Sequence, residues 1–132
     1  MQIFPNALYQ HYKGGLYQAI MPVINEADKR AMWVYRNKET GEHFVRPEIE
    51  FEKKFQFYIP FGTKLKGKEL DFVVIHVGND YYTLFCDSTK EELELKLMSV
   101  KSYLVCNHVV LQMKNSRRNC DFYQFVLNLK DL

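Results

Sequence analysis

The residues best suited to chemistry lie near the start of the chain, in the stretch YQHYKGGLY at positions 9–17. Alternate residues of a β-strand share a face, so Tyr9, His11 and Lys13 are predicted to point one way and the residues between them the other. A ring, an imidazole and an ammonium group in a row suit an anionic ligand with a planar part. The competing interpretation is that Tyr9 packs in a core and Lys13 is solvated.

A second candidate is Arg46, which stands directly before Pro47. The residue before a proline is held to an extended backbone, which restricts where its guanidinium can go. An arginine at the end of a strand commonly binds a carboxylate or a phosphate through two parallel hydrogen bonds. The alternative is an ion pair with Glu48 or Glu50, which are close in sequence.

Three short motifs occur in the first two-fifths of the chain. They are Tyr9-x-His11-Tyr12-Lys13-Gly14-x-x-Tyr17, then Val34-Tyr35-Arg36, then Val45-Arg46-Pro47 followed by Phe51. Together they resemble the signature of a family of small bacterial and phage domains of unknown function, which reads approximately YxHYKGxxY, VVY and WVRP.

This resemblance covers residues 9 to about 53. The family's tryptophan before Val-Arg-Pro is Phe44 here, so no indole nitrogen is available at that position. The resemblance implies a small barrel-like β domain and no established activity. It also favours one common site for a set of five residues: His11, Lys13, Tyr17, Tyr35 and Arg46.

Short strands would position the first candidate residues. Runs of β-branched and aromatic residues between turn formers predict strands over Leu8–Lys13, Leu16–Ile24, Ala31–Arg36, Glu42–Arg46 and Phe55–Ile59. A short helical turn is predicted from Pro47 to Lys53, because proline is tolerated at the first position of a helix. Residues 60–68 are predicted to form a loop.

Two hairpins are predicted in the remainder of the chain, over residues 70–86 and 105–129. Between them, a main α-helix is predicted over residues of about 88–104. Ser88 with Glu91 three residues later fits a capping box. Apolar residues then recur on a 3.6-residue period, at Leu93, Leu97, Val100 and Leu104.

Many strands with one main helix predict an α+β fold, built as a small antiparallel β barrel-like or strongly twisted sheet. The length of 132 residues fits a single domain. We expect one domain over residues 1–132, with a family-like β segment over 9–53 and a hairpin-helix-hairpin segment over 70–132.

The bulk composition gives no support to a nucleic-acid or a membrane partner. With 18 basic and 16 acidic residues, the net charge of +2 is too balanced to imply nucleic-acid binding by bulk electrostatics. No apolar run approaches the roughly 18 residues that span a bilayer, and the N-terminus has no signal-peptide pattern. Cys86, Cys106 and Cys120 are odd in number and lack CxxC spacing, so reduced thiols are expected. These features predict a cytoplasmic protein, in the host cytoplasm if a phage encodes it, with no membrane partner.

No catalytic residue, metal site or cofactor is predicted. The four histidines form neither HxH nor HExxH spacing, and the chain has no GxSxG and no Gly-rich phosphate loop. A hydrolase or transferase with an unrecognised site remains a third interpretation.

The leading hypothesis is a non-enzymatic binding module for a small anionic, nucleotide-like ligand. By analogy, a phage protein of this kind could sequester a host immune signal. The predicted ligand-binding residues are Tyr9, His11, Lys13, Tyr17, Trp33, Tyr35, Phe44 and Arg46.

The alternative hypothesis is a nucleic-acid-binding or protein-interaction β domain. It would use a basic hairpin tip and a stacking ring, comprising Lys114, Arg117, Arg118 and Tyr123. A second copy of the chain is another candidate partner, through pairing along an expected edge strand at Phe122–Leu129.

Overall fold

The computed structural model describes residues 2–79, 81–102, 107–116 and 121–132, without the side chains of residues 99–102. The chain divides into two compact units, Met1–Tyr58 and Ile59–Leu132. The single domain expected from the sequence stays a prediction. One cooperative unfolding transition would confirm it, and two separate transitions would contradict it.

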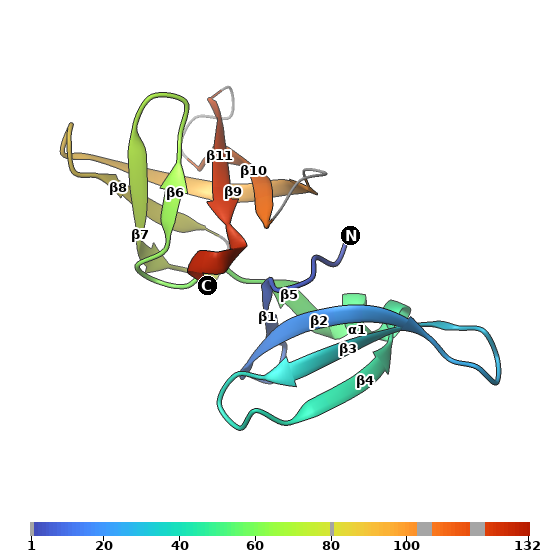
Figure 1. The fold of residues 1–132 in the computed structure, drawn as a ribbon. Helices are drawn as coiled ribbons and strands as arrows, with labels where there is room; N and C mark the ends of the chain where they lie inside the picture. The colour runs from blue at the N-terminus through green and yellow to red at the C-terminus, as the bar shows by residue number, and fades with distance from the viewer. Residues whose placement is uncertain (1, 80, 103–106, 117–120) are drawn as a thin grey trace. The chain divides into compact units, whose positions relative to one another are not determined.

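The first unit is a five-stranded antiparallel sheet with one short helix (Figure 1). In sheet order the strands are β4 (His43–Pro47), β3 (Ala31–Asn37), β2 (Leu16–Ile24), β1 (Leu8–His11) and β5 (Phe55–Phe57). The strands predicted for this part of the chain are confirmed, with ends that differ by no more than two residues.

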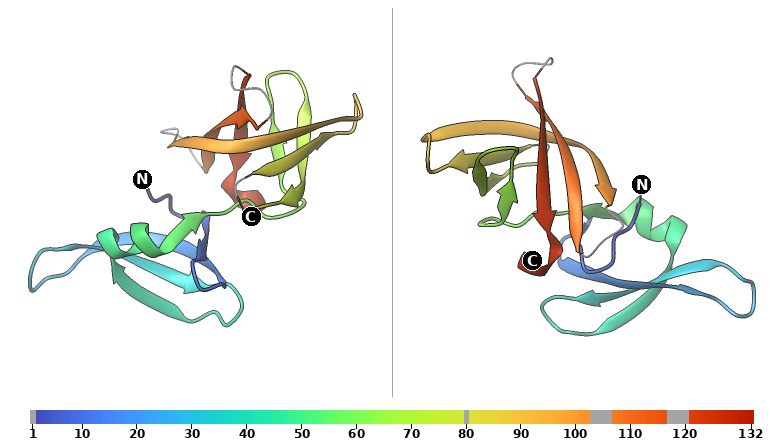
Figure 2. Two further views of the ribbon diagram at one scale, coloured as in Figure 1. Left: turned by 180° about the vertical axis from the view of Figure 1, so that it is seen from behind. Right: turned by 45° about the horizontal axis from the view of Figure 1, so that its top comes forward.

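Helix α1 (Glu48–Lys54) begins directly after Pro47, close to the predicted helical turn. Figure 2 shows it lying along one face of the sheet. Phe51 of the helix is fully buried, and its ring stacks on Phe55 with a centroid separation of 4.2 Å. The face of the sheet that α1 covers therefore holds the core of this unit, and we call it the inner face.

The first strand is shorter than predicted. It ends at His11, so Lys13 lies in the turn to β2 and not on the strand. Gly14 and Gly15 have φ values of +101° and +91°, which glycine adopts at little cost and other residues rarely adopt. The paired glycines end the strand early, because two successive positive φ angles reverse the chain there.

The second unit is a closed six-stranded barrel, which confirms the expected α+β fold with a small antiparallel barrel. The order around the barrel is β10 (His108–Asn115), β11 (Phe122–Asn128), β6 (Lys64–Lys66), β7 (Asp71–Val77), β8 (Tyr82–Cys86) and β9 (Glu91–Ser102). A short 3-10 helix, η1 (Leu129–Asp131), follows the last strand. Fully buried aliphatic side chains fill the barrel, among them Leu65, Val74, Leu84, Leu95, Leu111 and Leu127.

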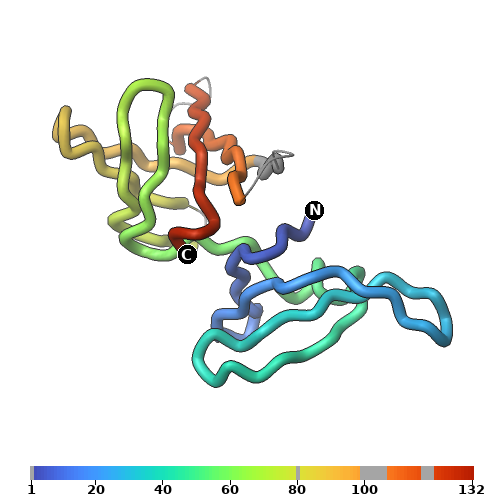
Figure 3. The backbone as a smooth tube through the Cα atoms, in the orientation of Figure 1, coloured from blue at the N-terminus to red at the C-terminus, as the bar shows by residue number. Residues whose placement is uncertain are grey.

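The predicted α-helix over residues of about 88–104 is wrong. Residues 91–102 form the longest of the described strands, β9, which Figure 3 traces as an extended segment. Leu93 and Leu95 are buried, and Glu94 between them is not, so the apolar residues here follow a two-residue period. Leu104, which completed the helical pattern, lies outside the described residues.

The expected capping box is also absent. Ser88 lies in a tight turn in which Lys90 has a φ of +60° and its N–H donates to the carbonyl oxygen of Cys86. This turn joins β8 to β9 as a hairpin, and the polar residues that suggested a helix start are turn formers instead.

The prediction of an edge strand at Phe122–Leu129 is also wrong. β11 pairs with β10 along its length and with β6 at Val126 and Leu127. Because β11 is part of a closed barrel, it has no free edge along which a second copy of the chain was expected to pair.

Candidate functional site

Five of the eight predicted ligand-binding residues come together on the inner face of the first unit. Tyr17 on β2 lies between His11 on β1 and Tyr35 on β3, with ring centroids 6.3 Å and 5.6 Å away. Phe44 on β4 stacks on Tyr35 at 5.6 Å. Arg46 completes the group, which we call the aromatic cluster: His11, Tyr17, Tyr35, Phe44 and Arg46.

The guanidinium of Arg46 is held in place by two partners. Its Nε donates to the hydroxyl oxygen of Tyr35 at 3.2 Å, and its Nη1 donates to Oε1 of Glu50 at 3.2 Å. The hydrogen bond to Tyr35 is the main reason that the pKa of Arg46 is raised. Lys54 binds the same Glu50 oxygen at 3.1 Å, so two cations share one carboxylate and one positive charge remains uncompensated. The ion pair with Glu50, left open from the sequence, is therefore confirmed.

His11 stands among positive charges. The pKa of His11 is lowered, first by burial of the imidazole and then by the charges of Arg46, Lys13 and Lys54. The backbone N–H of Lys13 donates to its Nδ1 at 3.1 Å, which leaves the proton of the neutral ring on Nε2. His11 therefore presents an N–H donor in a positively charged environment.

Tyr9 and Trp33 are structural. Tyr9 is fully buried, and its hydroxyl oxygen accepts a hydrogen bond from the N–H of Phe4 at 2.9 Å. Burial raises the pKa of Tyr9 to about 12, against a smaller lowering by the Phe4 hydrogen bond. Trp33 is also buried, and its indole N–H donates to Glu48 at 3.0 Å. Neither ring offers a free face to a ligand.

An open cavity of about 530 Å³ lies at the end of β1, beside His11. It is lined by Gln10, His11, Tyr12, Lys13, Gly14, Lys53, Lys54, Phe55 and Gln56. Three of these residues are lysines and none is acidic. We call this the lysine cavity; it contains His11 and Lys13 of the predicted site but not Tyr9, Trp33 or Phe44.

Sequence reasoning missed Gln10, Tyr12, Lys53 and Gln56 as candidate ligand-binding residues. Gln10 pairs directly with Gln56, and the N–H of Tyr12 donates to the carbonyl oxygen of Lys54 at 3.0 Å. The sequence signal was weak, because residues more than 40 positions apart meet only when β5 pairs with β1. The alternation within YQHY predicted that Gln10 and Tyr12 share a face, but β1 ends at His11 and Tyr12 lies in the turn that follows.

The alternative nucleic-acid site is only partly described. Arg117 and Arg118 lie outside the described residues. Lys114 pairs with Phe122, whereas Tyr123 pairs with Met113, a fully buried residue. Neighbouring residues of a strand point to opposite faces, so Lys114 and Tyr123 lie on opposite faces of the barrel wall.

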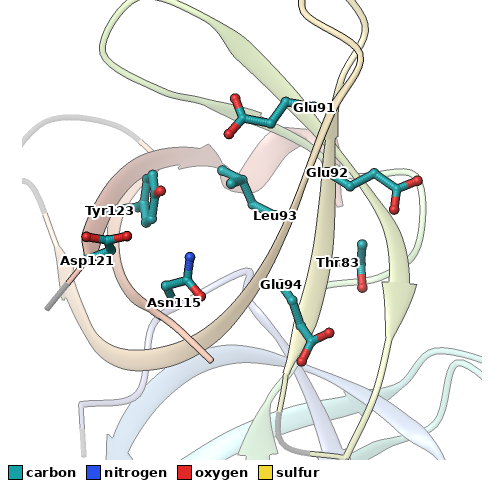
Figure 4. Close-up of a pocket in the computed structure, with 8 residues that line it drawn as sticks. All are labelled: Thr83, Glu91, Glu92, Leu93, Glu94, Asn115, Asp121 and Tyr123. Carbon is teal, nitrogen blue, oxygen red and sulfur yellow. The ribbon is translucent and has the colours of Figure 1, made fainter. Parts of the chain in front are cut away.

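Tyr123 instead lines an acidic groove of the second unit (Figure 4). The groove has a volume of about 530 Å³ and is lined by Thr83, Glu91, Glu92, Leu93, Glu94, Asn115, Asp121 and Tyr123. A lining with four acidic residues does not suit a phosphate backbone.

Within the part of the chain that the structure describes, no group of three or more His, Cys, Asp or Glu side chains is arranged to hold a metal ion. Cys86 is a buried free thiol of the barrel. Among the described helices, none combines the length and apolar character needed to cross a membrane.

Residues 7–57 match the model of a protein family described as a protein of unknown function, DUF1653. The match spans the first unit almost completely and agrees with the resemblance seen in the sequence motifs. Searches of the curated proteins and of the solved structures found no match. The first unit is thus similar, over residues 7–57, to a family of unknown function.

Proposed function

We propose that the first unit is a non-enzymatic binding module for a small anionic, nucleotide-like ligand. The observation that carries this proposal is the lysine cavity, whose lining holds Lys13, Lys53 and Lys54 and no carboxylate. Lys54 pairs with Glu50, whereas Lys13 and Lys53 form no ion pair within the described residues. Two uncompensated ammonium groups at one cavity favour an anion.

The electrostatics around the cavity support the same proposal. The charges of Arg46, Lys13 and Lys54 all act on His11, which shows that their fields overlap at that ring. An anion bound beside His11 would meet this summed positive potential and the neutral Nε2–H donor. Tyr17 contacts the ring of His11, and the hydroxyl of Tyr35 binds Arg46, so both groups are held in position.

A module without a catalytic group would act by sequestering or sensing its ligand. The biological role that we propose by analogy is sequestration of a host immune signal by a phage protein. A cytoplasmic location is part of the same proposal.

The test is thermal unfolding of the whole chain against nucleotides, cyclic dinucleotides, ADP-ribose derivatives and short oligonucleotides. A ligand at about one hundred times its dissociation constant stabilises the folded state by about 2.7 kcal/mol, which raises the midpoint by roughly 10 °C for a protein of this size. The Lys13→Gln/Lys53→Gln variant should lose this shift. The matched control is Lys29→Gln, which changes an exposed turn lysine that does not line the lysine cavity.

Salt separates this function from nucleic-acid binding. Contacts with several phosphates weaken by orders of magnitude between 50 and 200 mM salt. A shift given only by oligonucleotides, and only at low salt, would replace the proposed function with the nucleic-acid alternative. If a small nucleotide still raises the unfolding midpoint of the double lysine variant, the ligand does not bind at the lysine cavity, and that part of the proposed function is wrong.

A further inference from the structure

We propose that Gln10 and Gln56 select the base of a nucleoside phosphate whose ring stacks on Tyr12. This inference rests on the proposed function, and it names the chemical class of the ligand and the residues that determine specificity. The phosphate would bind the lysines of the same cavity.

The two glutamines form a matched pair. Gln10 on β1 and Gln56 on β5 are directly opposite each other in an antiparallel ladder, so their Cβ atoms lie roughly 5 Å apart on one face. Both are exposed, and both line the lysine cavity. Their neighbours Tyr9 and Phe57 point to the buried inner face, which fixes the direction of the glutamines.

The amide groups of Gln10 and Gln56 are available to form hydrogen bonds with a ligand. Within the described residues neither side chain makes a hydrogen bond, in contrast to Gln18, which donates to Asn6 and accepts from Arg36. An amide carries a donor and an acceptor side by side, the combination that reads the edge of a nucleic-acid base. Two such amides on adjacent strands can address one planar edge.

Tyr12 supplies a stacking surface beside the glutamines. It follows Gln10 by two residues, its N–H donates to the carbonyl oxygen of Lys54 at 3.0 Å, and it lines the lysine cavity together with the two glutamines. Its side chain is 65% exposed, so most of the ring is accessible to a ligand. The imidazole of His11 lies 4.6 Å from its ring centroid and Lys13 Nζ lies 5.6 Å away, contacts that orient the ring.

The lysines of the cavity come from two segments of the chain. Lys13 comes from the turn after β1, and Lys53 from the last turn of α1. A nucleoside phosphate has a planar base with an edge of donors and acceptors and a separate anionic group. It can use the ring, the amides and the ammonium groups at once, whereas a sugar phosphate or inorganic phosphate can use only the ammonium groups.

The test is calorimetric titration of the whole chain with the four common nucleoside 5′-monophosphates and with ribose 5-phosphate. We expect the preferred nucleotide to bind roughly 5- to 150-fold more tightly than ribose 5-phosphate, the range given by stacking on one aromatic ring. Tyr12→Ala should remove most of that advantage. Gln10→Leu and Gln56→Leu should each reduce the preference among the four bases by about fivefold or more. All three variants should leave ribose 5-phosphate binding unchanged.

Gln124→Leu, at an exposed glutamine of β11, is the matched control and should change none of these affinities. We expect all three variants to fold, because the substituted side chains are exposed. The unfolding midpoints of the unliganded variants check this.

Two outcomes would overturn the inference in different ways. If all four nucleotides and ribose 5-phosphate bind equally and depend on Lys53, the anion site stands and base recognition is wrong. If neither nucleotides nor ribose 5-phosphate bind, the proposed function fails together with the inference.

Discussion

The Nε of Arg46 lies 3.2 Å from the hydroxyl oxygen of Tyr35, on the neighbouring strand of the first unit. Tyr35 is buried, with only 4% of its surface exposed, and its ring contacts Tyr17, Phe44, Phe51 and Phe55. A hydroxyl at the edge of a packed aromatic group thus fixes the position of a charged group at its rim.

The variant Tyr35→Phe should therefore lower the free energy of unfolding by about 1 kcal/mol, the usual net contribution of one hydrogen bond. Urea denaturation measures this change. Tyr12→Phe is the control, because that hydroxyl belongs to an exposed side chain. An equal loss in both variants would show that the Arg46 hydrogen bond contributes nothing.

Tyr9 should make the protein sensitive to alkali. The pKa of Tyr9 is about 12 in the folded chain because the hydroxyl is buried, and about 10 in an unfolded chain. Between these values the unfolded chain has lost the proton and the folded chain keeps it, so stability falls as the pH rises from about 10 to about 12, by roughly 2–3 kcal/mol. Unfolding of Tyr9→Phe over the same range should lack this part of the slope, and identical slopes would contradict the assignment.

The strand β9 can be tested against the helix that the sequence suggests. Leu95 is fully buried, whereas Met98 is 53% exposed. Leu95→Ala should reduce the free energy of unfolding by about 2–5 kcal/mol, and Met98→Ala by less than about 0.5 kcal/mol. A helix with its apolar stripe on Leu93 and Leu97 would turn Leu95 away from the core, and Leu95→Ala would then be mild.

His11 should titrate below its ordinary range. Burial, followed by the charges of Arg46, Lys13 and Lys54, lowers the pKa of this imidazole. The unfolded chain then binds a proton more readily than the folded chain, so the contribution of His11 to stability is lost as the pH falls below about 6.5. NMR of the imidazole protons against pH measures the value directly. Lys13→Gln should raise it, and an unchanged pKa would mean that this ammonium group is screened.

The strands of the first unit could be predicted because local signals agree there. Gly14 and Gly15 mark one turn, Gly41 marks another, and alternating aromatic and β-branched residues fill the strands between them. Proline at position 47 also marks the start of the short helix. These signals depend on residues close in sequence, and tertiary packing does not override them.

The strand β9 could not be predicted in the same way. Leu93 and Leu97 satisfy both a four-residue helical repeat and a two-residue strand repeat, and Glu91, Glu92 and Glu94 suit the first turn of a helix. What decides between them is pairing with β8 and β10, since this strand closes the barrel. The partner residues lie outside residues 88–104, so the pairing leaves no distinct mark within that stretch.

The residues expected to share a site lie in three short motifs, each on a strand or at a strand end. His11, Tyr17, Tyr35 and Arg46 meet as expected, since adjacent strands bring them together. Tyr9 and Trp33 were included because a ring that packs in a core and a ring that stacks on a ligand look alike in a sequence.

Closure of the barrel has a consequence for how the protein could misassemble. Fibril growth by templating needs a strand with unpaired backbone groups, and the ring of strands in the second unit limits such a template. The sheet of the first unit is open, and β4 and β5 are its two outer strands. Because β4 ends at Pro47, which has no N–H to donate, and carries the charged Arg46, its sequence already includes two features that discourage the addition of another strand.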